Sequence, residues 1–522
     1  MPRILLKGLL TLICLSLAIH GHEAGRRRSY DVVNQLQVAA WQPLDSASNI
    51  TAFVDELGPQ LSPEASITLF GSDDFENLTA RWTAWKAPSF KAAVQVYTEE
   101  DVSNTIKCSN KFELPWLAVS GRHGGIQSLS KLDAGVQINL DYLVGLTIGS
   151  DGKSATISGG MTTKAITDAL WDQDKWTGTG ACECTSLAGP MLGGGHGFLQ
   201  GRFGLALDNL LSARVVLGNG SVVTASDETR PDLFWALRGA GHNFGVVTEV
   251  EYKIYDVPAE NNWIFADMIF TGDKVEEVFQ LTNDINNGGD QPIELVNIIE
   301  YRFAPEISTE EPVIEVLFLY EGTEEEAEKY LSLYKAICIE SSTLVEATYP
   351  DFARLYRFSE QDPACSEGQL HVQRFPVDLQ VYNITTQKQL LVNFRDTITE
   401  NPFLNNSFWL FEGYGSTAVR AVPDEATAFP DRFNEYLISP ALVYVNSTPE
   451  NDEIARLAGE KMRSIAVAGR EDGILSAYLN YANGYETLEE LYGHDAWRLE
   501  KLRKLKQLYD PDSRLSFYAP IA

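Results

Sequence analysis

The chain has 522 residues, of which 44% are hydrophobic and 22% are charged, and its formal net charge is −31. A single hydrophobic core rarely serves so long a chain, so we expect two or three domains. The excess of acidic residues repels nucleic acid and anionic membranes, so we expect neither as a partner.

Residues 1–24 have the pattern of a secretory signal peptide, with Arg3 and Lys7 near an apolar stretch at 9–19. A membrane anchor is the alternative, but this stretch is short for crossing a bilayer. Asn-x-Ser/Thr triplets, which are acceptors for N-glycosylation, agree with export; they begin at Asn49, Asn77, Asn219, Asn383, Asn405 and Asn446. We therefore expect a secreted, N-glycosylated monomer.

The first half of the chain alternates between short strands and helices. Segment 25–80 is mixed, with a helix-like stretch at 30–40. Strands are expected at 92–97, 116–120, 135–140, 146–148, 155–158, 210–218, 221–224 and 245–254, and helices at 99–110, 163–173 and 232–238. The pair Asn219-Gly220 predicts a hairpin turn. This pattern predicts an α+β domain that ends near Val257.

Residues 178–204 are unusually rich in glycine, and backbone N–H groups beside glycines suit a pyrophosphate. The spacing differs from the Rossmann fingerprint, because Phe198 and Gln200 stand where that fingerprint needs glycine. A second candidate at 239–245 has its third glycine one residue late. A dinucleotide is therefore expected to bind by a route other than the βαβ unit.

The second half has longer elements. Helices are expected at 274–283, 324–336 and 385–399, and strands at 313–320 and 407–414, which fits a sheet covered by helices on one side. An aromatic-rich stretch at 475–481 and an amphipathic helix at 497–509 follow, and residues 510–512 end that helix.

One of the six cysteines, Cys14, lies in the expected signal peptide, which leaves Cys108, Cys182, Cys184, Cys338 and Cys365. Because five is odd, at least one thiol is free or bonded to something other than cysteine. Cys338 and Cys365 flank a plausible loop and are the expected disulfide. Cys182 and Cys184 are separated by a single residue, and we do not expect them to pair with each other. No histidine cluster accompanies them at zinc spacing, so no metal site is expected.

Several motifs follow one another in a characteristic order. They are Ser-Gly-Arg-His-Gly-Gly at 120–125, the segments 135–140, 192–204, 208–217, 232–239 and 243–248, Tyr-Leu-Asn-Tyr at 478–481, and Tyr-Asp-Pro-Asp at 509–512. In this order the chain resembles the berberine bridge enzyme-like branch of the FAD-linked oxidases, within the vanillyl-alcohol-oxidase-type flavoproteins. The resemblance is strong over 80–257 and clear over 470–515.

The resemblance implies an α+β fold, with a two-subdomain PCMH-type FAD-binding domain and an inserted substrate domain whose antiparallel sheet is covered by helices. It implies an N-terminal segment of the FAD domain at 25–80, the main part of that domain at 81–257, a substrate-binding domain at 258–465, and a C-terminal segment at 466–522 that returns to the FAD domain.

The resemblance also implies covalently bound FAD. His123 occupies the place of the histidine that bonds to the flavin 8α carbon, and imidazole is a competent nucleophile once deprotonated. A turn histidine bonded to backbone is the alternative. Cys182, eleven residues before Gly193, matches the second attachment point of doubly linked members; Cys184 replaces it if the register shifts. The remaining cofactor-binding positions are Ser120, Gly121, Arg122, Gly124, Gly125, Thr185, Gly189, Gly193, Gly194, Gly195, Gly197, Gly245, Val246, Val247 and Asn480.

For catalysis, the resemblance places the base that takes the substrate proton at Tyr481. Tyr478 suits a structural role better, because strand alternation puts it on the opposite face. Glu412 and Tyr414 are reserve candidates for substrate contact, while His196 and His242 are expected to be structural or to lie beside the flavin. The resemblance also places at Thr185 the residue that admits or blocks O₂ in some members, where a small side chain goes with oxidase activity.

The sequence therefore predicts a secreted oxidase that transfers hydride from a small organic substrate to FAD and then reduces O₂ to H₂O₂. The substrate is a secondary metabolite, an alcohol or a sugar. Two alternatives stay open: a flavin dehydrogenase with another electron acceptor, and a flavin-binding secreted protein that has lost activity.

Overall fold

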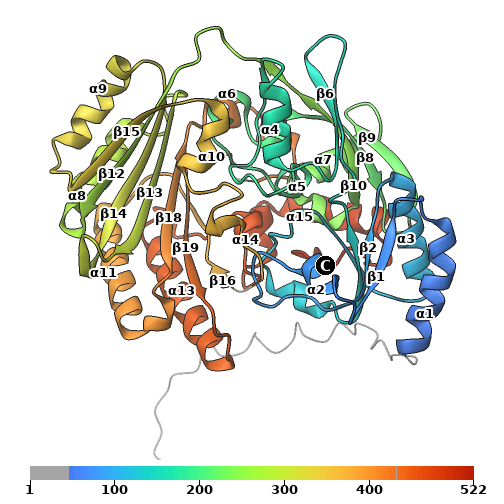
Figure 1. Ribbon diagram of the computed structural model, residues 1–522. Helices are drawn as coiled ribbons and strands as arrows, with labels where there is room; N and C mark the ends of the chain where they lie inside the picture. The colour runs from blue at the N-terminus through green and yellow to red at the C-terminus, as the bar shows by residue number, and fades with distance from the viewer. Residues whose placement is uncertain (1–45, 369, 431) are drawn as a thin grey trace, which may run out of the picture. The chain divides into compact units, whose positions relative to one another are not determined.

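The computed structural model describes residues 46–522, apart from 369 and 431, and its strands form four sheets within that range (Figure 1). The expected signal peptide and the helix-like stretch at 30–40 lie outside the described residues. Of the helices inside that range, none has both the length and the apolar character needed to cross a membrane.

A four-stranded sheet carries the loop at 120–125, which contains His123. Its order is β1 (Ser66–Leu69), β2 (Phe90–Gln95), β4 (Gly135–Asn139) and β3 (Trp116–Val119), with β3 and β2 both parallel to β4. Helix α3 (Glu99–Lys111) connects β2 to β3 and packs with α1 (Ser46–Leu57) on one face of this sheet. The Thr98 hydroxyl accepts from the Asp101 backbone N–H in a capping box, which fixes where α3 begins.

The second sheet is antiparallel and confirms the alternating pattern of the first half. Its order is β5 (Leu146–Ile148), β6 (Ser154–Ser158), β10 (Val246–Lys253), β8 (Leu210–Val216) and β9 (Val222–Ser226). The expected hairpin joins β8 to β9, and Gly220 in it has a φ of +80°, which favours glycine. Helices α4 (Thr163–Trp171) and α7 (Pro231–Ala240) share a hydrophobic core with this sheet. A separate two-stranded sheet pairs β7 (Lys175–Trp176) with β11 (Tyr255–Asp256).

The largest sheet has eight strands, all antiparallel. Its order is β15 (Ser341–Ala347), β12 (Trp263–Thr271), β14 (Ser308–Glu321), β13 (Leu295–Ala304), β18 (Phe408–Tyr414), β19 (Tyr436–Tyr444) and β16 (His371–Arg374), and β17 (Val377–Leu379) also pairs with β19. Helices α8 (Val275–Asn286), α9 (Glu324–Lys335), α11 (Ile384–Glu400) and α13 (Pro449–Ala468) lie along one side of it (Figure 1).

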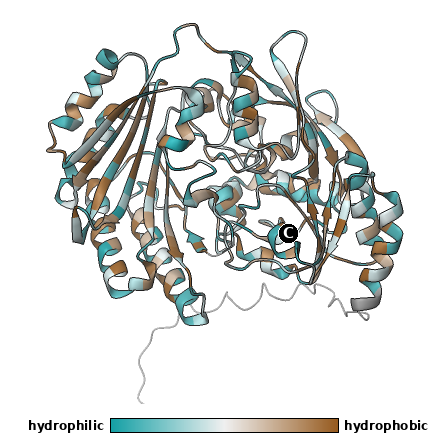
Figure 2. Cartoon of the chain, in the orientation of Figure 1, coloured by the Kyte–Doolittle hydropathy of each residue, from teal (hydrophilic) through white to brown (hydrophobic). Residues whose placement is uncertain are grey.

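Both faces of the central strands of this sheet are buried, and Figure 2 shows these strands largely in the hydrophobic colour, whereas the edge strand β15 is mostly exposed. On β18, Trp409 and Phe411 pack in the core under the helices, whereas Leu410 belongs to the core on the opposite face. Alternation along the strand therefore places Glu412 and Tyr414 on that opposite face as well. Sequence periodicity located only β14 and β18, because strands buried on both faces lack an alternating polar residue.

The last part of the chain returns to the first half. Helix α14 (Leu488–Tyr492) precedes α15 (Ala496–Tyr509), which packs on α7 with the Trp235 and Trp497 ring centroids 6.1 Å apart. The Lys506 Nζ donates to the Asn243 carbonyl at 3.0 Å. Short helices complete the fold: α2 (Phe75–Thr79), α5 (Ala188–Leu192), α6 (Gln200–Phe203), α10 (Phe352–Leu355) and α12 (Thr417–Arg420). The expected domain boundaries themselves stay a prediction.

Candidate functional site

A cavity of about 820 Å³ is lined by residues from the loop after β3, the glycine-rich segment, the start of β10, the eight-stranded sheet and the C-terminal segment. This volume falls in the range of cofactor and small-molecule sites. Most of the residues expected from the sequence line it: Ser120, Gly121, Arg122, His123, Gly124, Gly125, Cys182, Thr185, Gly189, Gly245, Val246, Val247, Asn480 and Tyr481.

Four of the expected glycines, Gly193, Gly194, Gly195 and Gly197, do not line the cavity. They allow close packing behind it instead. A Cβ on Gly193 would lie 2.2 Å from the Asn480 Oδ1, and one on Gly197 would lie 1.9 Å from the Thr179 carbonyl oxygen. Contact of these glycines with a cofactor stays a prediction.

The loop at 120–125 is pressed against the segment that carries the cysteines. A Cβ on Gly121 would lie 2.6 Å from the Cys184 carbonyl oxygen, so only glycine fits there. Arg122 has a φ of +53° and forms ion pairs with Asp141 and Glu367. These pairs hold the strained backbone on one side of His123.

His123 is presented as a neutral imidazole. Its ring stacks on Trp82 with the centroids 5.5 Å apart. Burial, followed by the charges of Arg81 and Arg122, lowers the pKa of His123 to about 4. The ring is therefore deprotonated at neutral pH, as a nucleophilic imidazole must be.

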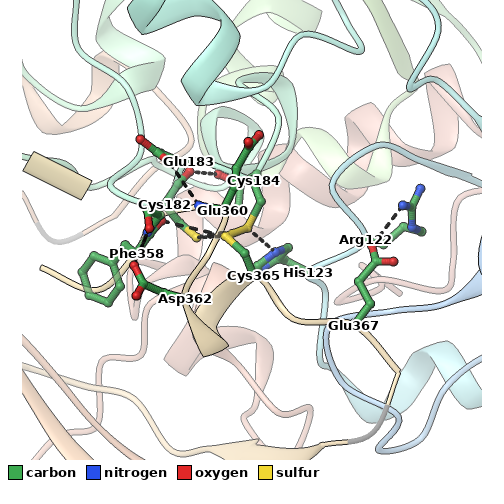
Figure 3. Close-up of a disulfide and its surroundings, with 12 residues drawn as sticks. Arg122, His123, Cys182, Glu183, Cys184, Phe358, Glu360, Asp362, Cys365 and Glu367 are labelled. Carbon is green, nitrogen blue, oxygen red and sulfur yellow. Dashed lines mark hydrogen bonds and ion pairs between the residues drawn. A yellow bond between two sulfur atoms is a disulfide. The ribbon is translucent and has the colours of Figure 1, made fainter. Parts of the chain in front are cut away.

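Three cysteine sulfurs meet beside this histidine (Figure 3). Cys184 and Cys365 form a disulfide whose Cα atoms are 5.8 Å apart. The Cys182 Sγ lies 3.5 Å from the Cys184 Sγ and 3.6 Å from the Cys365 Sγ. The Cys184 Sγ lies 3.1 Å from the His123 Nε2.

This arrangement corrects the expected disulfide. Cys338 is exposed and free, so a Cys338–Cys365 pair is wrong. The fold joins positions 181 residues apart, and loop length along the chain gave no sign of that. One ligand atom each from His123, Cys182, Cys184 and Cys365 lies within 4.8 Å of the others, a grouping that zinc spacing did not indicate. Because Cys184 and Cys365 are bonded to each other, only His123 and Cys182 of this group keep a free ligand atom.

At the sheet side of the cavity, Tyr481 lies among charged groups. Its ring lies beneath Arg374, whose guanidinium carbon is 3.3 Å from the ring centroid. The Tyr481 hydroxyl lies near the buried carboxyl of Glu412, whose Oε2 accepts from the Tyr414 hydroxyl at 2.6 Å. The Glu412 Oε1 is buried without a hydrogen-bond partner among the described residues. The Tyr414 ring is buried, and Tyr414 does not line the cavity.

The charges around Tyr481 act in opposite directions. Burial, and then the negative charge of Glu412, raises the pKa of Tyr481 well above its usual value, while the Arg374 cation lowers it. Burial also raises the pKa of Glu412, and Arg374 opposes that rise too.

Tyr478 and Tyr481 do not lie on opposite faces, which corrects the expectation from strand alternation. Residues Leu479–Tyr481 form a 3₁₀ turn, and its period brings the two rings to a centroid distance of 5.1 Å. The Tyr478 hydroxyl accepts from the Gly195 backbone N–H at 2.9 Å and from the Asn480 Nδ2 at 2.7 Å. Tyr478 therefore holds the glycine segment in place.

Comparison with known proteins agrees with this geometry. A family model described as an FAD binding domain matches residues 90–226. The FAD-linked oxidoreductase chyH of Penicillium rubens is 37% identical over 495 residues, which cover 93% of this chain and 98% of chyH. The chain belongs to the FAD-linked oxidoreductases.

Solved structures share the fold of this FAD-linked oxidoreductase. Physcomitrella patens BBE-like 1 aligns with a TM-score of 0.77 at 20% identity, over 90% of this chain and 99% of that one. A glucooligosaccharide oxidase from Acremonium strictum, described as carrying 6-S-cysteinyl, 8α-N1-histidyl FAD, aligns with a TM-score of 0.74 at 20% identity, over 91% and 99%.

The cavity of the FAD-linked oxidoreductase fits its cofactor on the evidence of its own polar atoms. The Ser120 Oγ, the Arg81 Nη1 and the His242 Nδ1 belong to residues that line the cavity, and they are buried without a hydrogen-bond partner among the described residues. Buried polar groups are normally satisfied, so these atoms indicate a polar occupant. His242 and His196 both line the cavity; the His242 Nε2 is bonded to the Gly189 carbonyl, and the His196 Nδ1 to the Gln200 side chain.

Sequence reasoning missed the residues that only the fold brings to the oxidoreductase site. Arg374 ends β16, and Glu300 lies on β13; both line the cavity. Burial and the neighbouring charge of Glu315 raise the pKa of Glu300 to about 7. No sequence motif marks Arg374 or Glu300. The only available sign of Arg374 was an arginine that follows three residues of a short strand.

Proposed function

We propose that this FAD-linked oxidoreductase is a secreted oxidase that dehydrogenates a small organic substrate and gives H₂O₂. The observation that carries this proposal is that Tyr481 and Arg374 line the same cavity as His123 and Cys182, with the Glu412 carboxyl buried behind Tyr481. When bound, FAD supplies the hydride acceptor and passes the two electrons to O₂.

The residues at the sheet side handle the proton. The substrate C–OH or C–NH gives its proton to the Tyr481 oxygen, while the phenol proton is held by the Glu412 carboxylate. Before the transfer the pair carries the negative charge of the Glu412 carboxylate, and the Arg374 cation stabilises this base form. Uptake of the substrate proton neutralises the pair. Glu412 thus shares the role of the base with Tyr481. The sequence named Glu412 only as a reserve candidate for substrate contact.

Two residues of this chain are suited to hold FAD covalently. His123 is neutral and half-buried, and Cys182 is the one cysteine of this cluster that the disulfide leaves as a thiol. The double attachment described for the Acremonium strictum enzyme supports the same pair of linkages here. Attachment through His123, with Cys182 as the second link, is part of the proposal.

The lining of the sheet side favours a substrate with an apolar body, such as a secondary metabolite or an alcohol, over a sugar. Apolar and aromatic side chains form much of it: Tyr356, Phe358, Leu370, Phe408, Leu410 and Val443. Sugars bind where several polar groups satisfy their hydroxyls, because unpaired polar groups are costly to bury. Glu300, Arg357, Arg374 and Asn406 also line this side and supply anchors for the polar end of such a substrate.

Replacement of Tyr481 by phenylalanine tests this function. Tyr481→Phe should slow anaerobic flavin reduction by roughly 10²–10⁴-fold, the usual contribution of a positioned acid–base group. Reoxidation by O₂ should be unchanged, because it does not require removal of the substrate proton. Stopped-flow measurements separate the two steps, with a substrate found by screening alcohols, sugars and amines for H₂O₂ release.

The same experiment separates the alternatives. Normal reduction in Tyr481→Phe would move the base to another residue. Slow reoxidation by O₂ in the wild type would favour a dehydrogenase with another acceptor. Failure of every screened substrate to reduce the flavin would favour a protein that has lost its activity. Tyr349→Phe is the control, because Tyr349 is a buried tyrosine that does not line the cavity.

A further inference from the structure

The sulfurs of Cys182, Cys184 and Cys365 have two ways to form one disulfide. The structure contains the Cys184–Cys365 bridge and a free Cys182. The Cys182 Sγ lies 3.6 Å from the Cys365 Sγ, so a Cys182–Cys365 bridge requires only a small movement of side chains (Figure 3). That second bridge would release Cys184 next to the His123 ring.

The surrounding backbone holds the three cysteines together without help from the bridge. The Glu183 N–H donates to the Phe358 carbonyl at 3.0 Å, and the Glu360 N–H donates to the Glu183 carboxylate at 3.0 Å. Glu183 lies between the first two cysteines, and Phe358 and Glu360 lie in the loop that carries Cys365. These bonds keep the two segments in contact whichever sulfurs are joined.

We propose that Cys182, Cys184 and Cys365 form a thiol–disulfide exchange site that determines which cysteine binds the flavin. The Cys184–Cys365 bridge keeps Cys184 from reacting and leaves Cys182 free. This inference rests on the proposed covalent attachment of FAD. The choice of disulfide affects the cofactor because the Cys184 Sγ contacts His123, the other attachment residue. A free Cys184 would compete for the same end of the cofactor.

The exchange step is balanced without an added oxidant or reductant. The Cys182 thiol loses its proton, its sulfur bonds to the Cys365 sulfur, the Cys184–Cys365 bond breaks, and the Cys184 thiolate takes up a proton. Burial raises the pKa of the Cys182 thiol to about 12, so thiolate is scarce and exchange is slow at neutral pH. Attachment to the flavin replaces S–H by S–C and is a two-electron oxidation, for which O₂ is the oxidant.

Peptide mapping of unreduced protein tests the exchange site, because it identifies both the disulfide and the peptides that carry flavin. In the wild type we expect the Cys184–Cys365 bridge and flavin on His123 and Cys182. In Cys184→Ser, where O₂ oxidises the two remaining thiols, we expect a Cys182–Cys365 bridge, so that flavin on cysteine falls at least tenfold although Cys182 is intact. In the double variant Cys184→Ser, Cys365→Ser no partner remains for Cys182, and flavin returns to it.

The return of the link in the double variant is an outcome that simple damage to the fold does not produce. Cys338→Ser is the control, because Cys338 is exposed and free, and its map should match the wild type. If Cys184→Ser fails to fold, Cys365→Ser decides: flavin on Cys184, or a Cys182–Cys184 bond, supports the exchange site. Flavin on Cys182 alone in that variant overturns it.

The outcomes also separate this inference from the proposed second link. Full flavin on Cys182 in Cys184→Ser, with Cys365 a free thiol, overturns the exchange site and leaves the Cys182 link standing. A wild type without flavin on cysteine, together with a Cys184 link in Cys365→Ser, supports the exchange site and overturns the Cys182 link. Absence of flavin from cysteine in all variants overturns both.

Discussion

The Arg374 guanidinium lies over the Tyr481 ring, close to the buried carboxyl of Glu412. Burial raises the pKa of both acidic groups, and the arginine is the nearby cation that opposes the rise. Such a cation within about 4–6 Å typically lowers the pKa of an acid by roughly 1–3. The proton affinity of the Tyr481–Glu412 pair is therefore set by a residue from a strand far away in the sequence.

We expect Arg374→Met to move the pH dependence of flavin reduction upward. Removal of the cation raises the pKa of the pair, so more of it is protonated at neutral pH and reduction slows. Because the base form returns at higher pH, the rate should recover there, with the midpoint raised by roughly one to three pH units. The measurement is the anaerobic reduction rate as a function of pH.

Arg354→Met is the matched control, because the Arg354 side chain is 63% exposed and pairs with Asp351 at the surface. Its pH profile should match the wild type. A lower rate in Arg374→Met with an unchanged midpoint would mean that Arg374 orients the substrate and does not set the proton affinity.

At the scale of elements, the segment between α5 and α6 shows why its glycines are needed. Gly194 and Gly195 have φ values of +136° and +87°, which favour glycine. Gly197 is required for a different reason, since a Cβ there would lie 1.9 Å from a backbone oxygen that cannot rotate away. This segment carries Gly195, whose N–H binds Tyr478, and so places the tyrosine pair.

We expect Gly197→Ala to lower the free energy of unfolding by at least 1–3 kcal/mol, roughly the cost of overpacking a tight core. Urea unfolding of the holoprotein measures the change. Gly58→Ala is the control, because a Cβ at Gly58 meets nothing within 4 Å. Equal urea midpoints for the two variants would contradict the close packing of the glycine segment.

At the scale of the whole described chain, long-range links join the stretch 81–257 to the stretch 258–465. Arg432, after α12, binds Asp208 through two hydrogen bonds of 2.9 and 3.1 Å, and the side chains are 0% and 6% exposed. The Cys184–Cys365 disulfide is a second, covalent link between the same two stretches. Both hold the sheet that carries Glu412 against the segments that line the cavity.

We expect Arg432→Met to destabilise the protein by about 3–5 kcal/mol, because it leaves the Asp208 charge buried without its partner. Thermal unfolding of the holoprotein measures this. Arg456→Met removes an exposed pair with Glu453 on α13 and should change little. Recovery of stability in Arg432→Met, Asp208→Asn would show that the cost comes from the unpaired charge; no recovery would point to lost packing of Arg432.

The sequence by itself determined the elements of the first half and the family. Strands such as β2 and β10 were predictable because one face or one end is polar, and α3 because its residues follow helical periodicity. The loop of His123 and the tail of Tyr481 were recognisable because each is a local motif, and local motifs survive without knowledge of contacts.

Only the tertiary structure decided how the site is assembled. The Cys184–Cys365 bridge, the position of Arg374 over Tyr481, and the contact of Tyr481 with Glu412 all join residues at least 69 positions apart. The strands that carry Glu300 and Glu412 are buried on both faces, so their pattern does not reveal which side chains face the cavity. Chemistry that depends on proximity across the fold is not written in any one stretch of the chain.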